Sequence, residues 1–226
     1  ITMPHVYRGA DRSYVFGGAI TAGAAVTWFR EAFCQAEVAE AARTGEDAHA
    51  LIERKAIEVP PGAEGLVFLP YLMGERSPIW DAQAKGAFIG LSLAHSRAHM
   101  YRAVLEGVSF ALQHNIEAGR QSGQPLDDRL IVVGGAAHSD LWMQIVADVT
   151  GYPVFTIEEE VEAALGAAML AALGAGLVDA ATAERGWVTL VERARPEPAA
   201  RAVYRERFDI YRLLYPALRD AMHRLR

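Results

Sequence analysis

Residues 128–148 read Asp128-Arg-Leu-Ile-Val-Val-Gly-Gly-Ala-Ala-His-Ser-Asp-Leu-Trp-Met-Gln-Ile-Val-Ala-Asp148. The apolar run 130–133 predicts a buried strand, residues 134–137 predict a small-residue loop, and the apolar residues that follow recur at helical spacing. Ser139 is a good N-cap for that helix, because its hydroxyl can accept a hydrogen bond from a free amide of the first turn. A strand that leads through a glycine turn into a helix presents free N–H groups and the positive end of the helix dipole. Nucleotides are often held against such a turn, so this stretch is a candidate nucleotide site.

The glycine pair in this loop does not decide the function by itself. It is not a Walker A motif, which needs a lysine after its last glycine to contact the phosphates. The only lysines in the chain are Lys55 and Lys85, and neither follows a glycine loop. The spacing does not match Gly-x-Gly-x-x-Gly either. Many α/β turns contain two glycines for tight packing alone, so a purely structural interpretation stays open.

The composition is that of an ordinary globular protein. A chain of 226 residues is expected to bury about 70% of its unfolded surface without disulfides. The net charge of −6 argues against a nucleic-acid surface, because phosphate neutralisation needs a basic patch. No apolar run approaches a membrane span and no signal peptide is visible, so we expect a cytoplasmic protein that does not bind membranes. The first residue is Ile1 rather than Met, which predicts a trimmed start or a fragment of a longer chain.

Strands and helices alternate along the chain, which predicts an α/β fold with helices over a mainly β core. The predicted strands are 14–16, 66–70, 86–91, 130–133 and 153–157, and the predicted helices are 26–43, 46–55, 96–119, 139–150, 163–172 and the C-terminal helix. Residues 179–191 are weakly helical, and 193–198 form a linker or an extended arm. The single cysteine, Cys34, falls inside the predicted helix 26–43 and cannot form an internal disulfide, in agreement with a reducing compartment.

Two helices carry glycine in their interior. Ala103, Gly107 and Ala111 are small residues that let the helix 96–119 pack closely on a neighbour. Gly166 costs about 1 kcal/mol relative to alanine in the helix 163–172, so we attribute it to the close approach of another element.

The last helix has a heptad-like row of apolar residues that Pro216 interrupts. The row consists of Tyr204, Phe208, Tyr211, Tyr215, Leu218, Met222 and Leu225. We interpret it as a kinked helix that lies on its own domain, and a coiled-coil contact with a partner is the alternative.

Residues 86–106 resemble the C-terminal signature of the FGGY carbohydrate kinase family. That signature is a small residue, an apolar residue, glycine, an apolar residue, a gap of seven, a polar–apolar pair and an apolar–acid ending. Its places are filled by Gly86, Phe88, Gly90, Leu91, His99, Met100, Ala103, Val104, Leu105 and Glu106. Three further stretches are similar to the family: 134–144 to its adenosine turn and helix, 22–28 to its second nucleotide-side loop, and 162–168 to its small-residue helix. The loop 74–78 is similar to xylulokinase-like members, and the resemblance extends from about residue 14 to 179.

The resemblance implies an actin-like, ribonuclease H-type ATPase domain, with a mixed sheet flanked by helices, that forms the second half of such kinases. Residues 1–192 would form this domain, and 193–226 a linker with a C-terminal helix packed on it. The family places the sugar site, the first phosphate loop and the catalytic aspartate in the first domain, which is missing here. Homodimers are possible.

The resemblance also implies a nucleotide site at six positions. They are Gly23, Thr27, Gly134, Gly135, Ala136 and Ser139. Gly135 and Ser139 would line the pocket for adenine and ribose. Gly134 and Ala136 would shape that pocket, and Ala136 occupies the place of a third glycine common in the family. Gly23 and Thr27 would lie toward the phosphates of ATP, which would themselves hold most of the Mg²⁺ coordination.

No catalytic residue is assigned in this chain. Glu106 is expected to pair with Arg102 one turn earlier, and Asp140 to stabilise the helix N-terminus. The role of Asp81, a loop carboxylate, stays open, and one alternative is that it faces the cleft. Glu75 and Arg76 lie in the same loop, either in a functional role or as a local ion pair that fixes the turn.

No metal site is predicted. His95 and His99 are four residues apart, a spacing that can hold a metal on one helix face. No cysteine, histidine or glutamate stands at a further ligand spacing, and the family signature already accounts for His99.

Three functions remain after this comparison. The first is the nucleotide-binding half of an ATP-dependent kinase for a ketopentose or related polyol. The second is a stand-alone nucleotide-binding or interaction module that docks through its C-terminal aromatic helix. The third is an actin-like ATPase of another purpose, because a fold does not set function. A kinase half predicts an exposed apolar edge around residues 1–20, whereas a self-contained module predicts sealed edges.

Overall fold

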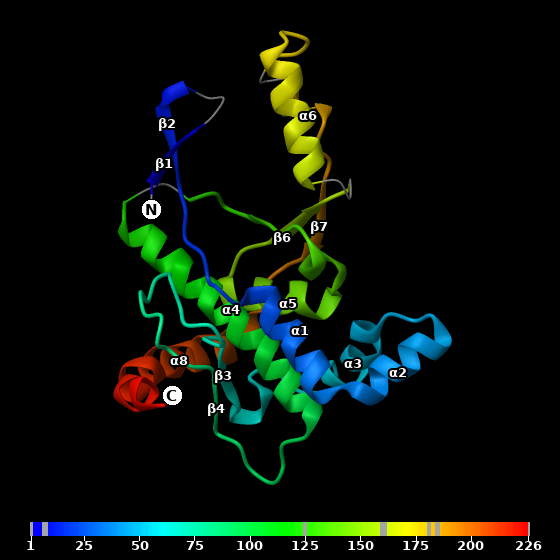
Figure 1. The fold of residues 1–226 in the computed structure, drawn as a ribbon, viewed down its shortest axis with the longest axis vertical. Coiled ribbons are helices and arrows are strands. Elements are labelled where there is room, and N and C mark those ends of the chain that lie inside the picture. The colour runs from blue at the N-terminus through cyan, green and yellow to red at the C-terminus, as the bar shows by residue number, and fades with distance from the viewer. Residues whose placement is uncertain are drawn as a thin grey trace.

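The computed structural model describes residues 2–5, 9–123, 126–158, 162–179, 182–183 and 186–225. A body of helices surrounds α4 (Arg97–Gln121), which runs through the centre of the molecule (Figure 1). Two elements project from this body at the top of the view. They are α6 (Glu162–Gly174) and the antiparallel hairpin of β1 (Thr2–His5) and β2 (Gly9–Val15).

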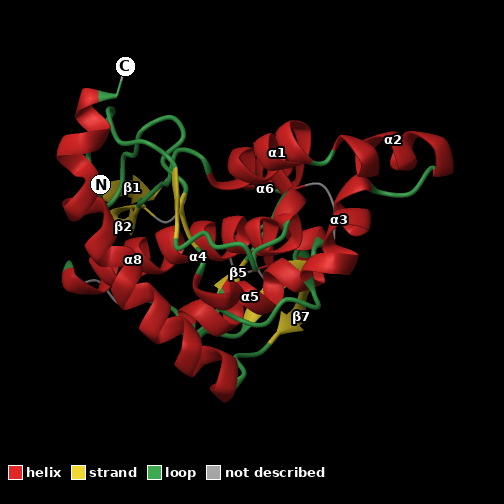
Figure 2. Ribbon diagram, turned by 90° about the horizontal axis from the view of Figure 1, so that it is seen from below, coloured by secondary structure: helices red, strands yellow, loops and turns green. Residues whose placement is uncertain are grey.

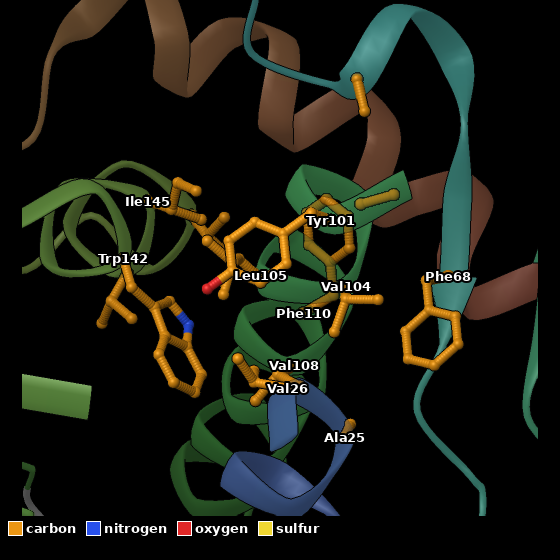
Figure 3. Packing of buried hydrophobic residues seen from close by; sticks show 14 of the residues in the cluster. Ala25, Val26, Phe68, Tyr101, Val104, Leu105, Val108, Phe110, Trp142 and Ile145 are labelled. Atoms are coloured by element: carbon orange, nitrogen blue, oxygen red, sulfur yellow. The ribbon is translucent and has the colours of Figure 1, made fainter. Parts of the chain in front are cut away.

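The hydrophobic core is built on α4. Its inward residues include Val104 and Leu105, which are fully buried. Side chains from α1 (Ala22–Phe33), β3 (Val67–Leu69) and α5 (Asp140–Thr150) surround them (Figure 3). The two helices α4 and α5 lie between α1, α2 (Gln35–Thr44) and α3 (Ala48–Ala56) on one side and the C-terminal helix α8 (Pro198–Arg224) on the other (Figure 2). The predicted α/β class is confirmed, but the prediction of a mainly β core is wrong, because most residues of the buried cluster lie on helices.

Strand β3 pairs with β4 (Ala87–Ile89) in an antiparallel ribbon that lies against α4. A Cβ atom added at Gly107 of α4 would lie 2.3 Å from the carbonyl oxygen of Phe68. Only glycine permits this approach of helix and strand, which confirms the close packing predicted for the helix 96–119.

A second sheet contains β5 (Leu130–Ile131), β6 (Val154–Ile157) and β7 (Leu190–Ala194). β5 is parallel to β6 and β7 is antiparallel to it, so this is a mixed sheet. The predicted strand 130–133 is shorter than expected, although the amide of Val132 still donates to the carbonyl of Phe155 at 2.8 Å.

Strand β7 corrects the sequence prediction at residues 190–194, where the end of the weakly helical stretch 179–191 and the start of the linker 193–198 are a strand. Residues 182, 183 and 186 are helical, in agreement with the prediction. The predicted division of the chain after residue 192 falls inside this strand. β7 is an edge strand that contains Glu192 and Arg193, and charged side chains on an edge mask the apolar alternation of a strand.

The helix predicted at 26–43 is two helices. α1 ends at Phe33, and α2 (Gln35–Thr44) begins after Cys34, whose φ of −121° and ψ of 39° are not helical. Cys34 is fully buried, and burial raises the pKa of its thiol. Because neither glycine nor proline marks the break, the sequence pattern gave no signal for it. α3 (Ala48–Ala56) follows, with Asp47 as its N-cap.

The C-terminal helix α8 (Pro198–Arg224) lies on its own domain, as predicted, and continues through Pro216. Tyr204, Phe208 and Tyr211 are buried, and the Tyr211 hydroxyl is 2.9 Å from that of Tyr71. Leu225, the last member of the predicted apolar row, is 65% exposed and does not belong to the contact. The aromatic face of α8 is therefore not available as a docking surface.

Helix α6 corrects the interpretation of Gly166. A Cβ atom added there would meet no atom within 4 Å, so no close approach requires glycine within the described structure. Leu170 on the same helix is 45% exposed.

No helix in the described part of the chain is long and apolar enough to cross a membrane.

Candidate nucleotide pocket

A cavity of about 670 Å³ lies between α1, α3, α4 and the start of α5. This volume is in the range of pockets that hold small ligands and cofactors. Five of the six predicted nucleotide-site residues line it, although they come from two regions more than a hundred residues apart. They are Gly23, Thr27, Gly135, Ala136 and Ser139.

The sixth residue, Gly134, shapes the loop rather than lining the cavity. It precedes the short 3₁₀ helix η2 (Gly135–His138) with φ 79° and ψ −167°, a conformation that residues with a Cβ rarely adopt. A Cβ atom added at Gly135 would meet no atom within 4 Å, so its missing side chain leaves open space. The hydroxyl of Ser139 accepts a hydrogen bond from the amide of Trp142 at 3.0 Å, which confirms the predicted N-cap of α5.

The N-terminus of α1 faces this cavity through Gly23. The preceding Thr21 does not cap the helix, because its hydroxyl donates to the carbonyl of Pro70 instead. The first turn of α1 also contains no acidic residue. Free amides and the positive end of the helix dipole therefore favour a negatively charged group on this side of the cavity.

A further wall of the cavity was not predicted. It is formed by α3, and its polar lining residues are Asp47, His49 and Glu53, next to Tyr101 of α4. The sequence predicted a helix at 46–55, but the face of α3 that meets the glycine loop depends on contacts between distant segments. Trp142 supplies an apolar part of the wall and is 7% exposed.

The polar groups of this wall form a chain of hydrogen bonds. Arg30 can only donate, so its Nη1 donates a hydrogen bond to His49 Nε2 at 3.1 Å, and the ring hydrogen of the neutral imidazole is on Nδ1. His49 Nδ1 then lies 3.4 Å from the Tyr101 hydroxyl, which donates to Glu53 Oε1 at 3.4 Å. Ser139 donates to the same Oε1 at 2.7 Å. Tyr101 and Ser139 both donate hydrogen bonds to Glu53, so the carboxylate of Glu53 is the final acceptor of this chain.

The ionisation of these groups follows from their surroundings. Burial lowers the pKa of His49, and the nearby charge of Arg30 lowers it further, which keeps the imidazole neutral. Burial raises the pKa of Glu53, while the hydrogen bonds from Ser139 and Tyr101 act in the opposite direction.

The acidic residues considered for a catalytic role have structural partners. Glu106 is buried and accepts a hydrogen bond from Arg102 at 2.8 Å, which confirms the predicted pair, and another from Tyr204 at 2.8 Å. Asp140 lies in the first turn of α5 and pairs with Arg193 at 2.6 Å.

Asp81 does not face the cavity. Its Oδ2 accepts hydrogen bonds from the Tyr215 hydroxyl and from His223 Nε2, both at 2.7 Å. The role of Asp81, which the sequence left open, is therefore structural: its carboxylate binds two side chains of α8.

Glu75 fixes the loop after β3, but not through an ion pair with Arg76. Its Oε1 accepts hydrogen bonds from the backbone amides of Arg76 at 2.7 Å and Ile20 at 3.0 Å. The guanidinium of Arg76 instead lies 5.4 Å from the ring centre of Phe16. Burial raises the pKa of Glu75. This carboxylate thus ties the loop to the segment before α1.

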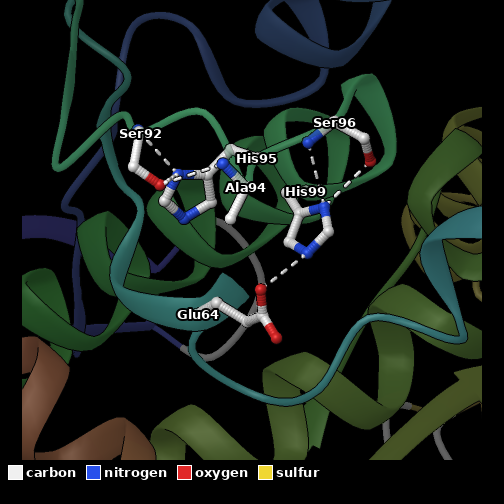
Figure 4. A network of polar contacts seen from close by, with 6 residues as sticks. All are labelled: Glu64, Ser92, Ala94, His95, Ser96 and His99. Atoms are coloured by element: carbon white, nitrogen blue, oxygen red, sulfur yellow. Dashed lines mark hydrogen bonds and ion pairs between the residues drawn. The ribbon is translucent and has the colours of Figure 1, made fainter.

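His95 and His99 stabilise the start of α4 (Figure 4). His99 Nδ1 accepts a hydrogen bond from the Ser96 amide at 3.2 Å, and its Nε2 lies 3.2 Å from Glu64 of the short helix η1 (Ala63–Gly65). His95 Nδ1 accepts from the Ser92 amide at 2.9 Å. Within the described ranges, no group of three or more His, Cys, Asp or Glu side chains could hold a metal ion.

The family model described as FGGY family of carbohydrate kinases, C-terminal domain, matches residues 3–175. The chain belongs to this FGGY family. A xylulose kinase of Bacillus subtilis is 35% identical over 212 residues, which cover 93% of this chain and 40% of that relative. A gluconokinase of Bacillus licheniformis is 33% identical over 215 residues, covering 95% of this chain and 42% of that relative. The FGGY chain thus spans about two fifths of the length of these relatives.

Solved structures agree with this assignment. The crystal structure of xylulose kinase from Rhodospirillum rubrum superposes with a TM-score of 0.77 at 36% identity, over 92% of this chain and 40% of that chain. At 20% identity, glycerol kinase from Plasmodium falciparum has the same fold, with a TM-score of 0.64. The chain therefore has the predicted actin-like ATPase fold of the FGGY kinases, and it corresponds to their C-terminal domain.

Proposed function

We propose that this chain is the nucleotide-binding half of an ATP-dependent carbohydrate kinase. The whole enzyme would transfer the γ-phosphate of ATP to a hydroxyl of a sugar such as a ketopentose. The observation that carries the proposal is the cavity, which gathers Gly23 and Thr27 of α1 with Gly135, Ala136 and Ser139 of the glycine loop.

The cavity fits a nucleotide in size and in polarity. Its volume of about 670 Å³ accommodates a nucleoside, and the absence of a Cβ atom at Gly135 leaves room for a base or ribose against the backbone. The uncapped N-terminus of α1 at Gly23 suits phosphate oxygens. Mg²⁺, held mainly by the phosphates of ATP, would neutralise charge that develops during phosphoryl transfer.

The sugar site and the general base are proposed to lie outside this chain. The acidic side chains Asp81 and Glu106 are committed to contacts with α8. Tyr14, Val15, Phe16 and Ile20 are each at least 38% exposed, which is the exposed apolar edge expected of a kinase half. An adjoining domain would cover that edge and close over the sugar, excluding water from the transferred phosphoryl group.

The identity of the sugar is a separate part of the proposal. The relatives include a xylulose kinase at 35% identity and a gluconokinase at 33%, so this domain alone separates the two poorly. The similarity of residues 74–78 to xylulokinase-like members favours a ketopentose. Release of ADP by the complete enzyme, with xylulose and gluconate compared, tests this choice.

The nucleotide site is tested by calorimetric titration of the purified chain with ATP–Mg²⁺ and with ADP, repeated on Gly135→Val. We expect a dissociation constant in the micromolar to millimolar range for the unchanged chain. The valine side chain would fill open space in the cavity, so the variant should fold normally and lose binding.

Gly166→Val is the matched control, because its added side chain also meets no atom within 4 Å but lies on α6, away from the cavity. It should bind nucleotide as the unchanged chain does. A folded chain that binds no nucleotide at millimolar concentration, or a Gly135→Val variant that binds as well as the control, would contradict the site.

A further inference from the structure

The elements that line the cavity differ in charge. The N-terminus of α1, around Gly23, offers free amides. The α3 side instead presents two acidic side chains, Asp47 and Glu53. Phosphates are repelled by carboxylates and attracted by a helix N-terminus, so a nucleotide is oriented with its phosphates at α1 and its nucleoside at α3.

The two carboxylates on the α3 side are not equivalent. Asp47 is the N-cap of α3 and accepts a hydrogen bond from the Ala50 amide at 2.9 Å. Glu53 receives the hydrogen bonds from Ser139 and Tyr101 on Oε1 alone. Its second oxygen, Oε2, makes no hydrogen bond within the part of the chain that the structure describes. In the described residues Asp47 Oδ1 likewise makes no hydrogen bond, but Asp47 is exposed to solvent, whereas Glu53 is half-buried and held by two side-chain donors. Glu53 is therefore the acceptor that is already fixed in place for a ligand.

Ser139, the residue first assigned to the nucleoside, has fewer hydrogen-bonding groups left for a ligand. Its only hydroxyl proton is donated to Glu53, and one lone pair receives the Trp142 amide. It thus has no proton to give a ligand while it holds Glu53. Ser139 and Tyr101 together fix the carboxylate of Glu53 toward the cavity.

We propose that Glu53 is a specificity-determining residue of this pocket, whose carboxylate accepts a hydrogen bond from the nucleoside part of the bound nucleotide. The donor is the exocyclic amino group of the base or a ribose hydroxyl, which share the chemistry that a carboxylate recognises. This inference rests on the proposed nucleotide site and adds to it the residue that recognises the nucleoside.

The test is calorimetric titration of the 226-residue chain and its Glu53→Gln and Glu53→Leu variants. The probes are ADP, purine riboside 5′-diphosphate, which lacks the amino group, the 2′-deoxy and 3′-deoxy forms of ADP, and pyrophosphate, which lacks the nucleoside. Glu46→Gln is the matched control, because Glu46 lies just before α3, outside the cavity lining, and pairs with Arg54. Circular dichroism confirms that each variant is folded, and Glu53→Gln keeps the shape of the side chain if Glu53→Leu does not fold.

Loss of a charge-assisted hydrogen bond should weaken ADP binding about tenfold in Glu53→Gln and more in Glu53→Leu. Removal of the contacted donor from ADP should weaken binding to the unchanged chain about tenfold, and have little effect on the Glu53 variants. The probe that shows this pattern identifies the donor as the amino group or a ribose hydroxyl. Pyrophosphate binding and the Glu46→Gln control should not change.

Two results would overturn the inference, and they differ from each other. If Glu53→Gln binds ADP normally, or weakens ADP, its analogues and pyrophosphate by one common factor, Glu53 only positions Ser139, and the proposed function stands. If the folded unchanged chain binds neither ADP nor pyrophosphate, the nucleotide site itself is wrong and the role of Glu53 falls with it.

Discussion

Asp81 connects the loop after β3 to the last turns of α8. Its carboxylate accepts hydrogen bonds from Tyr215 and His223, at 2.7 Å each, and its side chain is 12% exposed. Hydrogen bonds to a charged group contribute more than neutral ones, so we expect Asp81→Asn to lower the free energy of unfolding by about 1–2 kcal/mol at neutral pH. Urea unfolding measures this difference. Asp209→Asn, an exposed position on the same helix, should have no effect.

The contribution of Asp81 should also depend on pH. The hydrogen bond from His223, followed by the one from Tyr215, lowers the pKa of Asp81 from 3.8 to about 2. Because the pKa is lower in the folded chain, the stabilisation is present above pH 3.8 and is lost as the pH falls through 2. The difference in stability between the unchanged chain and Asp81→Asn should shrink over this interval. A difference that stays constant down to pH 2 would show that the charge of Asp81 does not contribute.

At the scale of single elements, replacement of an interior glycine by alanine is expected to have opposite effects on stability in α4 and in α6. Gly107→Ala places a Cβ atom 2.3 Å from the Phe68 carbonyl oxygen, so α4 and β3 must separate at a cost of about 1–3 kcal/mol. Gly166→Ala places its Cβ in open space on α6 and should stabilise that helix by up to about 1 kcal/mol. Thermal unfolding of both variants checks the signs. A loss of stability in Gly166→Ala would mean that α6 has a close neighbour after all.

The elements also show what local sequence determines. The N-cap at Ser139, the glycine contact at Gly107 and the Arg102–Glu106 pair were predictable, because each depends on neighbours along the chain or on side-chain size. The break at Cys34 and the strand β7 were not predicted, because tertiary contacts decide them against the local pattern. The glycine loop of the site was found by its pattern, but Glu53 was not, because its position beside Ser139 depends on a contact between segments far apart in the sequence.

At the scale of the whole molecule, α8 completes the core that α4 begins. Tyr204 donates to Glu106 of α4, Tyr211 meets Tyr71 after β3, and Phe208 lies 6.1 Å from Phe110 between ring centres. A helix that follows the matched FGGY region thus supplies aromatic groups to the centre of the fold.

This arrangement predicts that the chain does not fold without α8. Truncation after Glu197 exposes the partners of three buried aromatic residues, each of which contributes about 1.5–3 kcal/mol by its burial. The summed loss is comparable to the whole stability of a domain, about 5–15 kcal/mol. We expect the truncated chain to lose its cooperative thermal transition and to bind a dye specific for exposed apolar surface. A chain that ends at Arg224 loses only Leu225 and Arg226, and since Leu225 is 65% exposed it should unfold like the full chain. A cooperative transition in the chain truncated after Glu197 would instead make α8 a peripheral element, and the polar network of Arg102, Glu106 and Tyr204 dispensable for folding.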